Sequence, residues 1–401
     1  MDTTPLQDLT VLDFSHALAG PYCTMLLASY GASVYKVEGT GHVDMGRTWG
    51  PPFQGGEASY FLGINAGKRG LAIDFKHPRG RELCLKLAAR ADVVIENQRP
   101  GLMKKNGLGY DDLANLNPRL IYCSISGYGQ NGPSRDDPAM DLILQANSGL
   151  ISVTGTPGGE LARCGHSVAD ITAGMFALIG ILMALEVRHK TGRGQYVDVA
   201  MLDSMISAMA SNYAYLFGSG IVQGPQGTAF ATIVPYRTFK TRDREITVAV
   251  ASEKLWEAFC RAIERPGLTR DPLYETNPKR VANRDTLEPM LCEIFKAQPA
   301  AHWLDRFRTV GVPCTLVRNL QEVADDPQAA ARGMFPVVEH ATAGPVRVTG
   351  LPVKLSESPG RVSQAAPLHG QHTWEALGAL LGLDEDTLRA LAADGIIGPG
   401  R

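Results

Sequence analysis

The sequence predicts an α/β protein, with a Rossmann-like open parallel sheet in a large domain and a second, smaller α+β domain. Within residues 1–130, short apolar runs alternate with longer helix-like stretches, which is the pattern of βαβ units. A stretch rich in Gly, Pro and Gln at 218–227 has the composition of a linker, and the strand-like runs after it favour an antiparallel pair. The chain of 401 residues is also too long for one ordinary core.

The expected strands are short apolar runs followed by turn residues, and the expected helices lie between or after them. The strands are expected at 10–14, 33–37, 71–75, 92–96, 120–126 and 196–200. The helices are expected at 21–30, 79–91, 141–187 and 202–216. The most apolar run, 171–185, is shorter than the ~20 residues that a bilayer span needs. We therefore expect a buried core helix there.

The same pattern divides the chain into three parts. Residues 1–224 form the large domain, and residues 225–330 form the small α+β domain, whose strands 236–240 and 245–250 are joined by a polar turn. Residues 331–401 contain strand-like runs and a final helix at 384–393 but no complete core. We expect this last segment to return to the large domain.

Composition and charge favour a soluble cytoplasmic protein. Hydrophobic residues make up 44% of the chain and charged residues 20%, and the net charge of -2 gives no field that would recruit nucleic acid or a membrane. The seven cysteines are scattered and never form a CxxC pair, so we expect reduced thiols and no metal site. The N-terminus lacks the basic and apolar regions of a signal peptide.

A glycine-rich motif follows the fifth expected strand. Gly127-Tyr128-Gly129-Gln130-Asn131-Gly132 matches the dinucleotide-binding pattern GxGxxG. Pro133 and a polar turn come next, whereas the pattern needs a helix whose N-terminus meets the pyrophosphate. The sequence therefore disfavours a nicotinamide or flavin cofactor, although a loop at this edge of a sheet is still a place where ligands bind.

A second motif resembles the nucleophile elbow of serine hydrolases. Gly165-His166-Ser167-Val168-Ala169 departs from GxSxG only at its last position. The strand that should precede it is weak. His369 and His372 come late enough in the chain to serve as the base. A hydrolase that uses Ser167 is therefore a less favoured alternative.

Asp170 directly precedes the apolar run and has two interpretations. In the structural one, its carboxylate is the N-cap of a helix. In the chemical one, the carboxylate attacks an activated acyl group and forms a covalent intermediate. The helix dipole would keep Asp170 ionised, and the small residues Ala169, Ala173 and Gly174 would leave room for a bulky ligand.

Several polar residues lie in loops where an open sheet binds its ligands. His16 comes just after the first expected strand, where it either contacts a ligand or caps a backbone group. Lys68, Arg69, Arg99 and Lys104 lie in loops after or between strands. If they converge on one edge of the sheet they suit phosphate groups, and otherwise they are simply solvated.

A set of short motifs, in order along almost the whole chain, resembles the family III CoA transferases. This group includes formyl-CoA:oxalate and carnitine CoA transferases and the α-methylacyl-CoA racemases. The motifs are Val11-Leu12-Asp13-Phe14 with Ala19-Gly20-Pro21, Tyr35-Lys36-Val37-Glu38, Asn65 with Gly67-Lys68-Arg69, Glu96-Asn97 with Arg99-Pro100-Gly101, Gly127-Tyr128-Gly129 with Gly132-Pro133, Ala169-Asp170, the run from Arg188 to Gln195, Gly311-Val312-Pro313-Cys314, and Pro367-Leu368 with Gly370-Gln371-His372-Thr373.

The resemblance implies a two-domain fold, an interlocked homodimer and Asp170 as the catalytic nucleophile. It implies acyl-CoA and carboxylic acids as substrates, an aspartyl anhydride and an aspartyl-CoA thioester as intermediates, and neither a metal nor a tightly bound cofactor. It also implies that the CoA channel is lined by a set of loop residues. These are His16, Ala17, Lys68, Asn97 and Arg99.

Departures from family motifs bear on the substrate. Leu18 stands where formyl-CoA transferase has Gln, which disfavours formyl and oxalyl groups, and Met140 stands where the racemases have a proton-transferring His. The segment 227–241 resembles the succinyl-CoA:dicarboxylate branch. We therefore expect succinyl-CoA as the donor, and Arg163, His166 or Arg237 as the cation that binds a second carboxylate. A racemase of the same fold is the alternative.

Overall fold

The computed structural model describes residues 4–399 and divides them into two compact units. The larger unit contains the residues up to Leu150, then Arg163–Ile221, and the residues from Pro327 on, whereas the smaller one contains Ile151–Ala162 and Val222–Asp326. The sequence predicts residues 151–162 as part of the large domain, whereas they belong to the smaller unit. The Gly227 N–H donates a hydrogen bond of 2.8 Å to the Gly155 carbonyl, which fastens this segment to the smaller unit.

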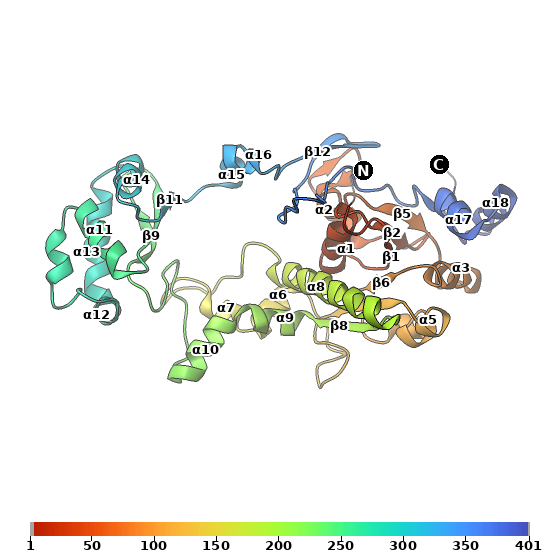
Figure 1. The fold of residues 1–401 in the computed structure, drawn as a ribbon, viewed down its shortest axis with the longest axis horizontal. Coiled ribbons are helices and arrows are strands. Elements are labelled where there is room, and N and C mark those ends of the chain that lie inside the picture. Colours follow the sequence, from red (N-terminus) through yellow and green to blue (C-terminus); the bar gives the residue numbers. More distant parts are fainter. Residues whose placement is uncertain (1–3, 400–401) are drawn as a thin grey trace. The chain divides into compact units, whose positions relative to one another are not determined.

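The larger unit is built on a parallel sheet of six strands, as the sequence predicts (Figure 1). The strands are β1 (Thr10–Asp13), β2 (Ser33–Glu38), β5 (Arg69–Ala72), β6 (Val93–Glu96), β7 (Ile121–Ser126) and β8 (Tyr196–Ala200). The third of these begins and ends earlier than the expected 71–75. Their order is β5-β2-β1-β6-β7-β8, so the chain reverses direction across the sheet between β1 and β6. Ligands of open α/β sheets bind beyond the carboxyl ends of the strands at such a switch point.

Helices cover both faces of this sheet. One face packs against α1 (Ala19–Ser29) and α8 (Val168–Thr191). The core on the other face includes Leu12, Leu71 and Tyr122 of the sheet and residues of α3 (Pro78–Ala88), α5 (Tyr110–Leu116), α17 (Thr373–Leu381) and α18 (Glu385–Ala393). The C-terminal segment therefore supplies part of the core of the larger unit.

The expected long helix over 141–187 is wrong. The structure has α6 (Asp141–Asn147), α7 (Leu150–Val153) and then α8, and a loop from 154 to 167 separates α7 from α8. Gly155, Pro157, Gly158 and Gly159 lie in this loop, and both residue types disfavour helix. Similarly, the expected helix 202–216 is divided into α9 (Met201–Ala208) and α10 (Ala210–Ser219).

Helix α8 is longer and more exposed than the buried core helix that the sequence predicts. Its small residues Ala169, Ala173 and Gly174 are buried, and a Cβ atom on Gly174 would lie 2.6 Å from the Ala19 carbonyl oxygen of α1. Gly174 is thus needed for the close packing of two helices, and it leaves no room for a ligand. On the outer side, large apolar side chains are 36–61% exposed. They are Met175, Phe176, Ile179, Leu182, Met183 and Val187.

By length and hydropathy alone, α8 meets the criteria for a membrane span, which core helices of soluble proteins also meet. Its contacts with α1, β7 and β8 place it in the layer that covers the sheet (Figure 1). Helix α8 therefore packs on the sheet with one side, and its outer side is the side that faces away from these contacts.

The smaller unit is α+β. Its sheet has the order β11-β10-β9 and is antiparallel, with β9 (Tyr236–Lys240), β10 (Glu245–Ala249) and β11 (Cys314–Leu316). The aromatic side chains of Trp256, Phe259 and Phe295 form the centre of its core. Its helices are α11 (Glu253–Ala262), α12 (Asn277–Ala282), α13 (Arg284–Lys296), α14 (Ala300–Thr309), α15 (Leu320–Ala324) and the 3-10 helix Pro266–Arg270.

Short elements complete the larger unit. They are the 3-10 helix Met45–Thr48, β3 (Phe53–Gln54), β4 (Glu57–Ala58), α2 (Ser59–Ile64), α4 (Leu102–Lys105), α16 (Pro327–Ala331), β12 (Val337–His340) and β13 (Gly344–Arg347). Strands β3 and β4 form one antiparallel pair, and β12 and β13 form another. Residues of α2, β12 and β13 share a small apolar cluster.

Candidate active site

The loops after β1 and β6 are joined by reciprocal hydrogen bonds at the switch point of the sheet. The His16 N–H donates to Asn97 Oδ1 at 2.8 Å, and Asn97 Nδ2 donates to the His16 carbonyl at 2.8 Å. The Asn97 amide is therefore engaged in holding the His16 loop. Burial lowers the pKa of the His16 ring, so the ring is neutral at pH 7.

The next residue, Ala17, has a left-handed backbone with φ of 62°. This conformation is uncommon for a residue with a side chain and occurs where the surrounding structure imposes it. The Ala17 N–H donates to Asp44 Oδ1 at 2.9 Å, and the Gly46 N–H donates to the same oxygen at 2.8 Å. Asp44, which the sequence analysis did not identify, thus holds the loop that was expected to meet CoA.

Beneath this loop lies a buried cluster of charges. Lys68 Nζ is 3.0 Å from Asp13 Oδ2, Lys36 Nζ is 2.8 Å from Asp44 Oδ2, and Lys36 also donates to the Ser15 carbonyl at 2.8 Å. Burial works to raise the pKa of Asp13, but the charges of Lys68 and Lys36 outweigh it and hold that pKa well below its usual range. The cluster fixes the ends of β1 and β2.

The predicted phosphate-binding cations do not gather in one place. The Lys68 side chain is fully buried and paired with Asp13, and its contact with CoA stays a prediction. Arg69 extends to the opposite face of the sheet, where it donates to the Tyr35 hydroxyl at 3.2 Å and lies 3.9 Å from Glu375. Lys68 lies in the loop before β5, whereas Arg69 is the first residue of β5.

Arg99 and Lys104 remain exposed cations near the carboxyl end of β6. Arg99 lies in the loop directly after Asn97. Lys104, in α4, is 74% exposed and 3.3 Å from the Asp111 carboxylate, and its neighbour Lys105 is also exposed. These positions keep Arg99 and Lys104 as candidate phosphate contacts.

Asp170 is the third residue of α8 and not its N-cap. Ser167 occupies the cap position without a side-chain hydrogen bond, and the N–H of Ala169 donates to Asp141 Oδ1 of α6 at 2.9 Å. The interpretation of Asp170 as a cap is therefore wrong, since a carboxylate from another helix takes part of that role.

The surroundings of Asp170 disfavour its charge. Burial, and then the like charge of Asp141, raise the pKa of Asp170 to about 7. The helix dipole is expected to keep Asp170 ionised, but this pKa shift has the opposite direction. Burial and the charges of Asp170, Asp44 and Asp141 also raise the pKa of Tyr60, a half-buried residue of α2 whose ring meets Trp49 edge-on at 5.0 Å.

The predicted substrate contacts fall into three groups. Leu18 is buried just before α1, and Met140 is 60% exposed just before α6. Arg163 and His166 are exposed in the segment that leads into α8, where Arg163 donates to the Cys164 carbonyl at 2.9 Å. Arg237 belongs to the smaller unit, and its guanidinium is already paired with the Glu288 carboxylate.

Neither the hydrolase-like motif around Ser167 nor the glycine-rich motif at 127–132 has the geometry that its chemistry needs. His369 Nε2 lies 2.9 Å from the Gly39 carbonyl, and His372 Nδ1 accepts from the Gly70 N–H at 3.1 Å, so both late histidines hold other segments. After the glycine-rich loop 127–132, the chain forms turns until α6 begins at Asp141. Within residues 4–399, His, Cys, Asp and Glu form no group of three or more that could hold a metal ion.

Asp44, Asp141 and Tyr60 were missed as site residues. Asp44 lies outside every motif, and its role depends on contacts with the distant residues Ala17 and Lys36. Asp141 had a signal, because it follows Met140 and begins the helix expected from 141. Tyr60 had none, since an aromatic residue at the start of a short helix is usually part of a core.

Comparisons with known proteins agree with this architecture. A family model described as CoA-transferase family III matches residues 6–373. Human succinyl-CoA:glutarate CoA-transferase is 37% identical over 394 residues, which cover 98% of this chain and 90% of that protein. Succinyl-CoA:mesaconate CoA-transferase of Haloarcula marismortui is 38% identical over 399 residues, which cover 97% of this chain and 99% of that protein. A crystal structure of a CAIB/BAIF family protein from Brucella suis has a TM-score of 0.84 and 34% identity. The match covers 94% of this chain and 100% of that chain.

Proposed function

Because this chain belongs to CoA-transferase family III and is an enzyme of the transferase class, we propose that it moves CoA from succinyl-CoA to a small carboxylate or dicarboxylate, with Asp170 as nucleophile. One observation carries the assignment of Asp170. It is a partly buried carboxyl at the start of α8 whose pKa is about 7, and among residues 4–399 no cation lowers that pKa. Such a group is half ionised at neutral pH and poorly solvated, which suits a nucleophile.

The proposed reaction begins at the thioester of the donor. An oxygen of the Asp170 carboxylate attacks the succinyl carbonyl carbon, the C–S bond breaks, and an aspartyl–succinyl anhydride and CoA thiolate form. The thiolate then attacks the aspartyl carbonyl, which releases succinate and leaves an aspartyl-CoA thioester.

The acceptor reverses these steps. Its carboxylate attacks the aspartyl-CoA carbonyl, giving a mixed anhydride and CoA thiolate again. Attack of the thiolate on the acceptor's acyl carbon yields the new acyl-CoA and restores the Asp170 carboxylate. Each step exchanges one acyl bond for another, so exclusion of water is what preserves the thioester energy.

CoA is proposed to bind where the loops after β1 and β6 meet. The His16–Ala17 backbone is held rigidly there by Asn97 and Asp44, and Arg99 and Lys104 are the exposed cations for phosphate groups. No tightly bound cofactor enters the proposed reaction. A cytoplasmic location remains our proposal from the sequence.

For the distal carboxylate of a dicarboxylate, Arg163 and His166 are the better candidates. Both side chains are exposed in the segment that ends at Asp170, whereas the charge of Arg237 is offset by Glu288. The relatives named for glutarate and mesaconate support a dicarboxylate acceptor. Arg163 has the geometry for a bidentate contact with a carboxylate.

Incubation with succinyl-CoA and single carboxylates should produce a new acyl-CoA that mass spectrometry identifies. We expect product with glutarate or mesaconate and little with oxalate. Arg163→Gln should raise KM by ~10-fold or more for the dicarboxylate and also for succinyl-CoA, because the succinyl group carries a free carboxylate of its own. No exchange with any acid, together with deuterium uptake beside the thioester of a branched acyl-CoA, would instead support the racemase.

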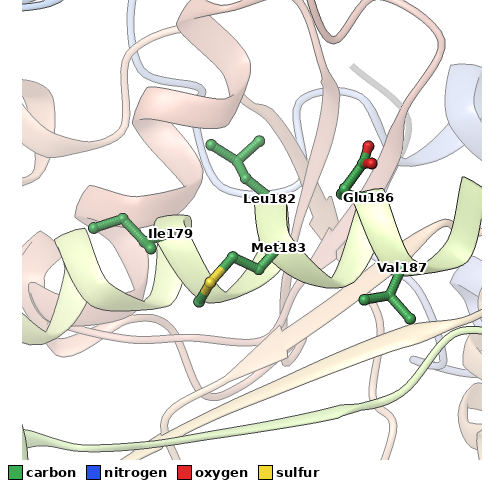
Figure 2. A pocket seen from close by; sticks show the side chains of 5 residues that line it. All are labelled: Ile179, Leu182, Met183, Glu186 and Val187. Atoms are coloured by element: carbon green, nitrogen blue, oxygen red, sulfur yellow. The ribbon is translucent and has the colours of Figure 1, made fainter.

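We also propose the interlocked homodimer, and the outer side of α8 supports a contact with a second chain. Figure 2 shows Ile179, Leu182, Met183, Glu186 and Val187 along this helix, where they line an open hollow of about 500 Å³. Contiguous exposed apolar side chains of this kind mark interaction surfaces.

The dimer predicts a solution mass of two chains of 43.1 kDa each, measured by light scattering after size exclusion. Met183→Glu combined with Ile179→Glu should shift the protein toward the monomer, because the two charges would be desolvated in the interface. Met183→Leu keeps the apolar surface and is the matched control. A wild-type mass of one chain would contradict the proposal.

A further inference from the structure

Two side chains of α6 fasten the segment that leads into the nucleophile. Asp141 and Gln145 lie one helical turn apart, and Gln145 Nε2 donates to Asp141 Oδ2 at 2.7 Å. Gln145 is fully buried, and Asp141 is half-buried. The two side chains therefore form a single hydrogen-bonded unit, which we call the α6 clamp.

The α6 clamp binds backbone groups of residues 164–169. Asp141 Oδ1 accepts from the Ala169 N–H at 2.9 Å, and Gln145 Oε1 accepts from the Cys164 N–H at 2.8 Å. Gln145 Nε2 also points to the His166 carbonyl, at 3.4 Å. Both ends of an irregular segment are thus attached to one helix.

The position of these bonds gives the clamp a functional consequence. Ala169 immediately precedes Asp170, and its N–H is one of the donors that the helix cannot satisfy internally. Arg163 directly precedes this segment, and His166 lies within it. A shift of the segment relative to α6 would therefore displace the nucleophile and the proposed substrate cations together.

We propose that Asp141 and Gln145 are positioning residues, which hold residues 164–169 on α6 and so place the Asp170 carboxyl for attack on the thioester. The proposal rests on the function proposed above. A displacement of about 1 Å at a reacting group costs up to ~100-fold in rate. Loss of the clamp should therefore lower kcat without removing any group that touches the substrate.

The clamp can be tested by exchanging its two functional groups. Asp141→Asn alone places an NH₂ group against either Gln145 Nε2 or the Ala169 N–H, so one bond is lost whichever way the amide turns. Gln145→Glu alone sets two carboxylates against each other. In the double variant, Asn at 141 donates to Glu at 145, and both backbone N–H groups keep their acceptors, so only the 3.4 Å contact with the His166 carbonyl is lost.

We expect each single variant to lower kcat by ~10–100-fold, and the double variant to recover most of kcat. Leu142→Gln, on the exposed side of α6, is the control and should leave kcat unchanged. Unchanged kcat in both single variants would overturn the proposal. So would a double variant no better than the worse single one.

Amide hydrogen exchange of the peptide 164–171 gives a readout that does not depend on catalysis. Exchange should be slow in the wild type, faster in both single variants and slow again in the double variant, while exchange in β7 stays constant. If the wild type has no transferase activity, the proposed function fails while this experiment still tests the clamp. Fast exchange of the wild-type peptide would overturn the clamp itself.

Discussion

Replacing Asp170 by Asn will lower kcat for CoA exchange by ~10³-fold or more, because the amide cannot form the aspartyl anhydride. Asn has nearly the same size as Asp, so the packing at the start of α8 is kept. In the wild type, succinyl-CoA should leave a covalent adduct on the peptide that contains Asp170, and mass spectrometry should find no such adduct in the variant.

The assignment of Asp170 as the nucleophile also predicts how activity changes with pH. The nucleophile must be ionised, and the pKa of Asp170 is raised to about 7. The value of kcat/KM should therefore rise as pH increases through about 7 and level off above it. A pH profile that is flat down to pH 5 would show that another group limits the reaction.

Stability should change in the opposite direction to activity. The unfolded carboxyl ionises near pH 4 and the folded one near 7, so the folded state binds the extra proton between these values and loses stability as pH rises across them. At pH 8 the Asn variant carries no such penalty, and its Tm should be higher than that of the wild type.

Asp203 provides the matched control for this substitution. It is also the third residue of a helix, α9, and its carboxylate is exposed. Asp203→Asn should therefore leave kcat within about twofold of the wild type and Tm within a few degrees. An Asp170→Asn enzyme that keeps a tenth of its kcat would contradict the assignment of the nucleophile.

Replacing Lys68 by Met will destabilise the protein by roughly 3–5 kcal/mol, because it leaves the Asp13 carboxylate buried without its closest cation. Lys68 also donates to Asn65 Oδ1 at 2.7 Å, and that oxygen would be left without this donor. Urea unfolding at pH 7.5, followed by circular dichroism, measures the loss.

Two further variants separate charge from packing. Lys104→Met removes a cation that is 74% exposed, and the free energy of unfolding should change by no more than about 1 kcal/mol. Adding Asp13→Asn to Lys68→Met should recover part of the stability, since the uncompensated charge is then gone. If Lys68→Met unfolds at the wild-type urea concentration, Lys68 is hydrated and available to CoA after all.

The sheet could be predicted from the sequence because each strand is a short apolar run between turn residues, as at β1 and β7. The role of Lys68 could not, because its partner Asp13 is 55 residues away, on a strand separated from β5 by β2. A lysine in a glycine-containing loop looks solvated until the fold places a carboxylate beside it.

The prediction for the start of α8 failed for a related reason. Asp before an apolar run is typical of an N-cap, and only the tertiary structure shows that Asp141 of α6 takes part of that role. Gly174 likewise suggested space for a ligand, whereas the approach of α1 explains it. In both cases, the local sequence indicated the right kind of residue, and its partner came from a distant segment.

The path of the chain determines the order in which the protein can fold during synthesis. The core of the smaller unit uses residues between Val234 and Leu316, which are close in sequence and leave the ribosome before the C-terminal segment from Pro327 on. The core of the larger unit joins Leu12 to Leu377 and Ile397, and Ile397 also forms a β-bridge with Ile73. The larger unit is thus the first to be synthesised and the last to complete its core. Its apolar residues stay partly uncovered until the C-terminal segment has been translated.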